Sequence, residues 1–146
     1  MIVVRRMVVD LGKHFAVRAS EWGLAGMAAG YGVALLWPGD TFGTSASYSF
    51  MAALANEATW GLAALTIGLI RLMALFINGT YRRSPLIRAG TAFLCVGLWT
   101  AIALGLSAGD ARAPATGLAI YPVLAALDIW NVYRSMRDGG EHGGRT

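Results

Sequence analysis

Residues 60–78 read WGLAALTIGLIRLMALFIN, and Arg71 is the only charged residue among them. A helix needs about 20 apolar residues to cross the hydrocarbon core of a bilayer. The stretch therefore predicts a membrane-spanning helix that contains a single charge. We expect this helix to begin within residues 49–54 and to end at Asn78, with Gly79 as its C-cap.

The composition of the whole chain favours the same interpretation. Of its 146 residues, 56% are hydrophobic and only 14% are charged, and the mean hydropathy is +0.55. Soluble domains carry about 25% charged residues. These values exclude a disordered chain and a long soluble domain on a membrane anchor, and they favour a small integral membrane protein. The net charge of +4 does not indicate nucleic-acid binding, because the basic residues lie at the ends of apolar runs.

Three further apolar runs have the boundaries of membrane helices. The first lies between Trp22 and Trp37, and tryptophan is enriched at the two interfaces of a bilayer. Ser84 and Pro85 supply an N-cap and a first helical residue for another run. The last contains Pro122, which is expected to kink its helix. We predict an all-α fold, an integral membrane bundle of four transmembrane helices at about residues 22–38, 54–78, 85–107 and 114–133.

The basic residues predict how this bundle is oriented. If both termini are cytoplasmic, only Arg112 lies outside and only Arg71 lies within a span. The other ten of the twelve basic residues are then cytoplasmic: Arg5, Arg6, Lys13, Arg18, Arg82, Arg83, Arg88, Arg134, Arg137 and Arg145. Because cytoplasmic segments are enriched in Lys and Arg, we expect both termini in the cytoplasm and the bacterial inner membrane as the location.

Residues 1–21 and 134–146 flank the four spans. The first segment predicts an amphipathic helix in the inner interface, because its apolar residues form one stripe opposite charged ones. That stripe is Val4, Met7, Val8, Leu11 and Phe15. An alternative is a cleaved secretory signal, with Arg5-Arg6 as a twin-arginine motif and cleavage near residues 45–47. The second segment is rich in glycine and polar residues, which predicts a flexible cytoplasmic tail.

Small residues at regular helical spacing indicate where the helices pack. Lipid provides no hydrophobic drive for helix association, so close backbone approach matters. The predicted packing residues are Gly26, Gly30 and Ala34 in the first span, Gly61, Ala64 and Gly68 in the second, and Gly97, Ala101 and Gly105 in the third. The small residues of the second span share a helix face with Glu57 and Arg71, so this face is expected to contact protein.

One ion pair is expected inside the bundle. Arg71 lies seven residues, or about 10 Å, before Asn78, and Asp128 lies at a matching depth in the fourth span. A charge within the membrane costs at least about 2.5 kcal/mol on insertion scales, and pairing reduces this cost. We therefore predict an Arg71–Asp128 ion pair, with Tyr121 and Asn131 as supporting polar groups.

Three interpretations of these charges stay open. They are a structural pair that fixes helix packing, a proton or ion path through Asp128, and an Arg71 side chain that extends to the inner headgroups. A permanently charged arginine would keep Asp128 ionised, which argues against a proton carrier. Near the outer end of the second span, Glu57 is expected to pair with Arg112.

Residues suited to catalysis or cofactor binding are scarce. His14 and His142 lie in the flanking segments, and Cys95, the only cysteine, is expected to be a small apolar filler. The sequence also lacks a phosphate-binding loop. We expect no catalytic residues, no metal or cofactor site and no enzymatic activity.

Two stretches resemble small uncharacterised membrane proteins encoded in bacterial phages and prophages. The first is Gly68–Gly79 with the following Tyr81-Arg-Arg-Ser-Pro, and the second is residues 116–122 together with residues 128–134. The similarity extends over about residues 60–138 and carries over no catalytic residue. It implies either a holin-like pore former or an inner-membrane protein that modifies the host envelope or excludes other phages.

Three functions remain open from the sequence. The preferred one is a structural or interaction component of the inner membrane, either as a homo-oligomer or with another membrane protein. A holin-like protein that permeabilises the membrane is the second, although holins usually have fewer spans. The third is a small transporter or channel, for which Asp128, Arg71 and the small-residue faces are the only candidates.

Overall fold

The computed structural model describes residues 18–80 and 84–143, and the regular elements within these ranges are all helical. This confirms the predicted all-α class. The elements are α2 (Ala19–Leu36), the 3-10 turn η1 (Ala46–Tyr48), α3 (Ser49–Leu54), α4 (Glu57–Thr80), α5 (Pro85–Ser107), the 3-10 turn η2 (Thr116–Ala119) and α6 (Tyr121–Gly143).

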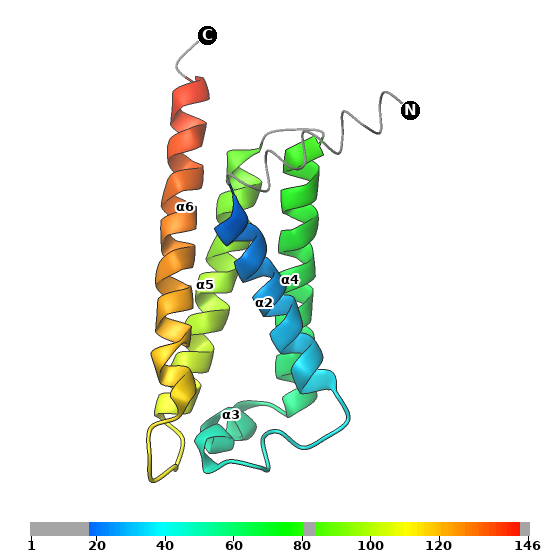
Figure 1. Ribbon diagram of the computed structural model, residues 1–146, viewed down its shortest axis with the longest axis vertical. Coiled ribbons are helices and arrows are strands. Elements are labelled where there is room, and N and C mark those ends of the chain that lie inside the picture. Colours follow the sequence, from blue (N-terminus) through cyan, green and yellow to red (C-terminus); the bar gives the residue numbers. More distant parts are fainter. Residues whose placement is uncertain (1–17, 81–83, 144–146) are drawn as a thin grey trace.

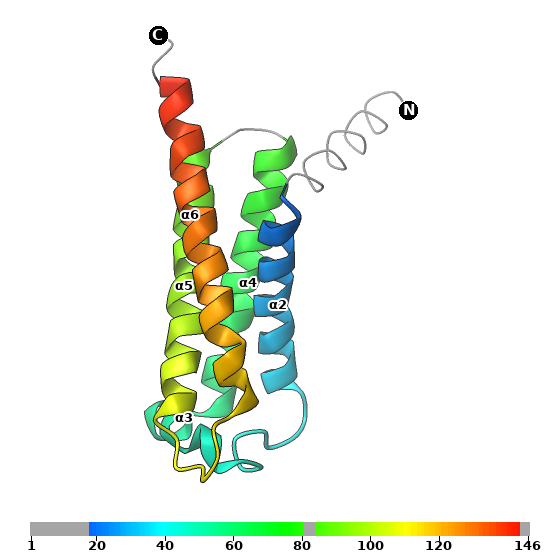
Figure 2. The same ribbon diagram turned by 60° about the vertical axis from the view of Figure 1, so that its left-hand side comes forward.

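The four long helices form two hairpins that lie side by side. Helix α2 packs on α4, and α5 packs on α6 (Figures 1 and 2). Short α3 lies with the connecting loops at one end, which we call the loop end. The opposite end, where α2 begins, α4 ends and α5 begins, is here called the basic end because Arg18, Arg88 and Arg134 lie toward it.

Helix α5 begins and ends where the sequence predicts. The Ser84 hydroxyl accepts a hydrogen bond from the backbone N–H of Ile87 at 3.5 Å. Pro85 occupies the first turn, where its missing N–H costs no intrahelical bond. The N-cap and proline signals thus define this boundary, as expected.

The second predicted span begins later than expected. Ala55 is extended, with φ −162° and ψ 156°, and separates α3 from α4. The Asn56 side chain then accepts hydrogen bonds at 2.8 Å from both the backbone N–H and the hydroxyl of Thr59. Asparagine is a strong N-cap, so the helix starts at Glu57. Gly79 lies within α4, so its assignment as a C-cap was wrong.

The fourth predicted span is displaced toward the C-terminus. Its helix starts at Tyr121 rather than near residue 114, so Pro122 lies in the first turn, where proline removes no intrahelical hydrogen bond. The expected kink at Pro122 was therefore wrong. Residues 134–143 continue α6 as helix, which corrects the prediction of a flexible tail over this part. In the first span, α2 already includes Ala19, and most of the predicted amphipathic segment, residues 1–17, lies outside the described residues.

Two of the described helices are long and apolar enough to cross a membrane by length and composition. They are α4 over Glu57–Asn78 and α5 over Pro85–Ser107.

The small residues of α4 pack as predicted. Ala64 is fully buried, and a side chain added at Gly61 would meet Leu35, Leu36 and the Gly32 carbonyl. One added at Gly68 would collide with the backbone of Ala29. The absence of side chains at these two glycines allows the backbones of α2 and α4 to approach closely.

The packing residues predicted for α2 were wrong. Gly26, Gly30 and Ala34 are exposed, and a side chain added at either glycine would meet nothing within 4 Å. The face that packs on α4 contains Gly32 and Ala29 instead, and Ala25 and Ala28 are the buried alanines of this helix. Because α2 has small residues on almost every side, several helix faces fit the same spacing rule.

In α5 the small-residue prediction is only partly right. Gly105 packs against the Met51 side chain of α3, and Ala101 is partly buried. Gly97 is exposed with nothing near it, so its assignment as a packing residue was wrong. The buried side of α5 is made by larger residues, including Cys95, Trp99 and Ile102. Cys95 is buried, and its role as a small apolar filler stays a prediction.

Candidate functional site

The structure brings Arg71 and Asp128 together, as their matching depth predicts. Nη2 of Arg71 on α4 lies 2.5 Å from Oδ1 of Asp128 on α6, and the two side chains are 1% and 0% exposed. This ion pair therefore joins the two hairpins in the interior of the bundle.

Two further donors bind the Asp128 carboxylate. The Trp99 indole N–H on α5 donates to Oδ2 at 3.1 Å, and the Asn131 amide donates to Oδ1 at 3.3 Å. Groups on α4, α5 and α6 thus converge on one buried carboxylate. Asn131 is the supporting residue that the sequence predicts. Trp99 was missed, because an indole in an apolar run is equally expected as core.

Tyr121 does not support the ion pair as predicted. Its ring stacks on Trp99 with centroids 5.9 Å apart, and it meets Tyr31 edge to face at 5.8 Å. Tyr31 also contacts Trp99 edge to face at 6.4 Å. The three rings form an aromatic cluster that holds the Trp99 indole in place, so Tyr121 acts on Asp128 only through Trp99.

A second buried ion pair was not predicted. Glu21 in the first turn of α2 binds Arg88 in the first turn of α5 through two hydrogen bonds, from Nη2 to Oε1 at 2.6 Å and from Nε to Oε2 at 3.1 Å. Both side chains are 3% exposed. Such a two-point pairing is the strongest geometry between arginine and a carboxylate. Arg88 was expected only as an orienting charge, and charges near helix ends are too common to indicate pairing.

The two ion pairs are crossed in sign between the hairpins. The α2/α4 hairpin contributes the acid Glu21 and the base Arg71, whereas the α5/α6 hairpin contributes the base Arg88 and the acid Asp128. Each hairpin therefore presents one positive and one negative group to the other. A one-turn slip of either hairpin, about 5.4 Å, would separate both ion pairs.

Weaker polar contacts continue from these pairs toward the basic end. The Ser20 hydroxyl on α2 lies 3.5 Å from the Asn131 carbonyl oxygen and donates to it. At the end of α4, the Asn78 amide donates to the Ala74 carbonyl at 2.8 Å, and its oxygen accepts from the Ser84 N–H at 2.5 Å. Asn78 thus connects the end of α4 to the cap of α5.

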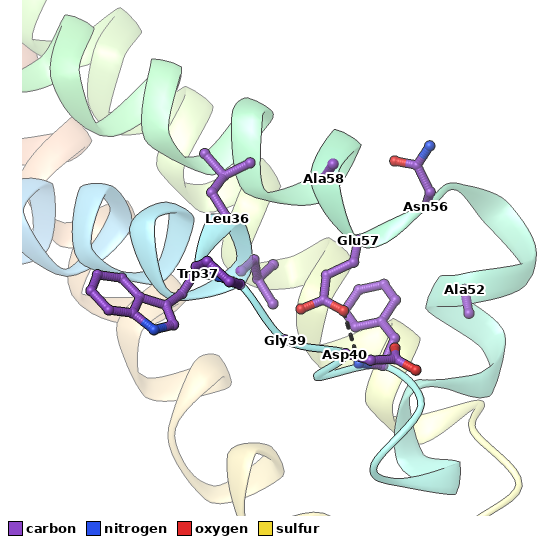
Figure 3. A pocket seen from close by; sticks show the side chains of 11 residues that line it. Leu36, Trp37, Gly39, Asp40, Ala52, Asn56, Glu57 and Ala58 are labelled. Carbon is purple, nitrogen blue, oxygen red and sulfur yellow. Dashed lines mark hydrogen bonds between the residues drawn. The ribbon is translucent and has the colours of Figure 1, made fainter.

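Glu57 has a different partner from the one predicted. Its carboxylate accepts hydrogen bonds from the backbone N–H groups of Thr41 at 3.2 Å and Phe42 at 3.0 Å. Figure 3 shows Glu57 extending from the start of α4 toward the loop at Asp40, beside an open pocket of about 610 Å³. Among the described residues Glu57 forms no ion pair with Arg112, which is exposed, so that predicted pair was wrong. Glu57 instead anchors the loop between the first two long helices.

The charged groups of the buried site are paired with one another. Each carboxylate faces an arginine at ion-pair distance, so the charges neutralise one another. Over residues 18–80 and 84–143, no group of three His, Cys, Asp or Glu side chains is placed to hold a metal ion. In comparisons with known proteins, no family model, curated protein or solved structure matches the chain.

Proposed function

We propose that the chain is a four-helix integral membrane protein that acts as a structural or interaction component of the bacterial inner membrane, without enzymatic activity. One observation carries this proposal: four charged residues on the long helices are buried as two ion pairs, whereas many large apolar side chains on the same helices are exposed. Leu86, Phe93 and Met73 are 79%, 67% and 63% exposed, whereas the four residues of the two ion pairs are almost fully buried.

This distribution is unfavourable in water and favourable in lipid. In water, exposed apolar surface costs about 25 cal/mol per Å², and buried charges gain little over solvated ones. In a hydrocarbon core the apolar side chains contact lipid, and the charges must face one another. The exposed apolar residues occur on all four long helices, for example Val33 of α2 and Val123 of α6. They therefore support a bilayer around the whole bundle.

Helix lengths are compatible with four crossings. Helix α2 has 18 residues and α6 has 23, which correspond to about 27 Å and 35 Å at 1.5 Å per residue. The hydrocarbon core is about 30 Å thick. We assign α2 and α6 as spans alongside α4 and α5, since α2 packs on α4 and α6 packs on α5.

The arginines support a cytoplasmic location for the basic end. Arg18, Arg88 and Arg134 lie toward it, while Arg112 lies in the connection at the loop end. The positive-inside rule favours this orientation, with both terminal segments in the cytoplasm.

The ion pairs favour a structural role over a transport role. Each of the four charges contacts a partner on the opposite hairpin, so the pairs fix register between hairpins. The alternatives are a holin-like permeabilising protein and a small transporter that uses Asp128 and Arg71. A phage-encoded origin, proposed from the sequence resemblance, would be supported by lysis or tail genes beside the coding sequence.

Fractionation and labelling test the proposal. In a Cys95→Ser background, Thr44→Cys places a thiol at the loop end and Met136→Cys one at the basic end, both at exposed positions. We expect the chain to stay in carbonate-washed membranes, and a membrane-impermeant maleimide to label Thr44→Cys in spheroplasts but Met136→Cys only after permeabilisation. Release by carbonate, or the opposite labelling, would refute the location or the orientation.

Induced expression discriminates among the three roles. A structural component should leave membrane potential and solute fluxes unchanged. Abrupt depolarisation followed by lysis would indicate the holin-like alternative, and selective flux that is lost in Asp128→Asn would indicate the transporter.

A further inference from the structure

Helix α6 has an outer face that combines aromatic and basic residues. Trp130, Tyr133, Arg134 and Arg137 follow the spacing i, i+3, i+4, i+7, which places them on one side of a helix. Trp130 and Tyr133 are 56% and 51% exposed, Arg137 is exposed, and Arg134 is partly exposed. We call these four residues the aromatic-arginine face.

The rotation of α6 is fixed by the opposite side of the helix. Asp128, Asn131 and Ser135 are buried in the bundle, and Asp128 is held there by Arg71 and Trp99. The ion pair that joins the hairpins therefore also directs the aromatic-arginine face outward.

The chemistry of this side of α6 changes along the helix axis. Val123 and Leu127, which precede the face on the same side, are large, apolar and exposed. The Trp130 and Tyr133 rings follow, in contact with centroids 5.7 Å apart. The two arginines come last on this side, and the end of α6 extends past the ends of α4 and α5 (Figures 1 and 2). This order matches the passage from acyl chains through the interface to the charged headgroups.

We propose that the aromatic-arginine face binds the headgroups of anionic phospholipids in the leaflet at the basic end. The proposal rests on the membrane location proposed above. Guanidinium groups bind phosphate oxygens through two parallel hydrogen bonds, and the Trp130–Tyr133 pair supplies the amphipathic surface that settles at the headgroup level. Bound anionic lipid fixes the depth of α6 in the membrane.

A second copy of the chain fits this face less well. A symmetric dimer brings the same patch of both subunits together, so Arg134 and Arg137 of one copy would face the same residues of the other. Like charges across an interface oppose association. The gradient from apolar through aromatic to basic residues follows the bilayer normal, which a protein partner does not require.

Lipid retention by the purified full-length chain tests the proposal. The chain is incorporated into vesicles of phosphatidylcholine and phosphatidylglycerol, extracted in mild detergent, and its bound lipids are counted by native mass spectrometry. The test variant is Arg134→Gln with Arg137→Gln, and the matched control is Arg112→Gln, an exposed arginine at the loop end. Far-UV circular dichroism and gel filtration verify that each variant is folded.

We expect the wild-type chain and the control to retain phosphatidylglycerol in preference to phosphatidylcholine. Since each arginine near an anionic surface contributes about fivefold in affinity, the double variant should lose this preference by about 25-fold. Equal retention of both lipids by the wild type, or an equal loss in the control, would overturn the proposal. If either outcome is found while the chain stays in carbonate-washed membranes, only the proposed lipid site is rejected. Release of the chain by carbonate would reject the membrane location itself.

Discussion

Glu21 of α2 and Arg88 of α5 bind each other through two hydrogen bonds of 2.6 and 3.1 Å, and both side chains are buried. They repeat, with the signs exchanged between the hairpins, the relationship of Arg71 to Asp128. Four charged residues thus form two ion pairs, and both pairs lie between the same two hairpins. Both ion pairs therefore join the two hairpins in one register.

The Glu21–Arg88 pair predicts a marked difference between single and double substitutions. Arg88→Leu should destabilise the chain by about 3–5 kcal/mol, because it leaves the Glu21 carboxylate buried without its partner. Glu21→Leu with Arg88→Leu should recover most of that loss, because apolar residues replace the whole pair. Unfolding in mixed micelles, followed by far-UV circular dichroism, measures both. A double variant as unstable as Arg88→Leu would contradict the pairing.

Trp99→Phe tests the indole contact to Asp128. The substitution removes the N–H that donates to the carboxylate at 3.1 Å but keeps an aromatic ring against Tyr31 and Tyr121. We expect a loss of about 1–3 kcal/mol, typical of a buried polar group that loses a hydrogen bond. The exposed Trp130 provides the control, since Trp130→Phe should change stability by less than about 0.5 kcal/mol. Equal effects of the two substitutions would argue against the contact.

Two glycines distinguish the side of α2 that packs on α4 in the structure from the side that the sequence predicts to pack. A methyl group at Gly68 would collide with the backbone of Ala29, whereas one at Gly30 would meet nothing. Gly68→Ala should therefore destabilise by about 1–3 kcal/mol through overpacking. Gly30→Ala should be neutral or stabilise by up to about 1 kcal/mol, because alanine is the better helix former. Thermal unfolding of the two variants measures the difference, and the reverse ranking would support the exposed face instead.

The sequence predicts those features of the fold that depend on local signals. Ser84 and Pro85 define the start of α5, because a side-chain cap and a fixed φ act within one turn. Arg71 and Asp128 could be paired because each interrupts an apolar run, where an unpaired charge is costly. The all-helical class follows from the length of the same runs.

Other features depend on contacts between distant segments. Glu21 and Arg88 lie near helix ends, where charges are ordinary, so only the packing of α2 beside α5 reveals their pairing. The packing side of α2 could not be chosen because alanine and glycine occur on nearly all of its sides. The glycine-rich end of α6 suggested a tail, since glycine is a poor helix former, although the helix continues to Gly143.

The most direct test of the account is a charge-exchange cycle at Arg71 and Asp128, measured as the yield of folded, membrane-inserted protein by fluorescence-detected gel filtration. Arg71→Asp and Asp128→Arg should each sharply reduce this yield, because each places two like charges in contact inside the bundle. The double exchange restores opposite signs at the same place and should recover a substantial part of the yield. A double variant no better than the worse single variant would contradict the claim that this buried pair holds the two hairpins in register.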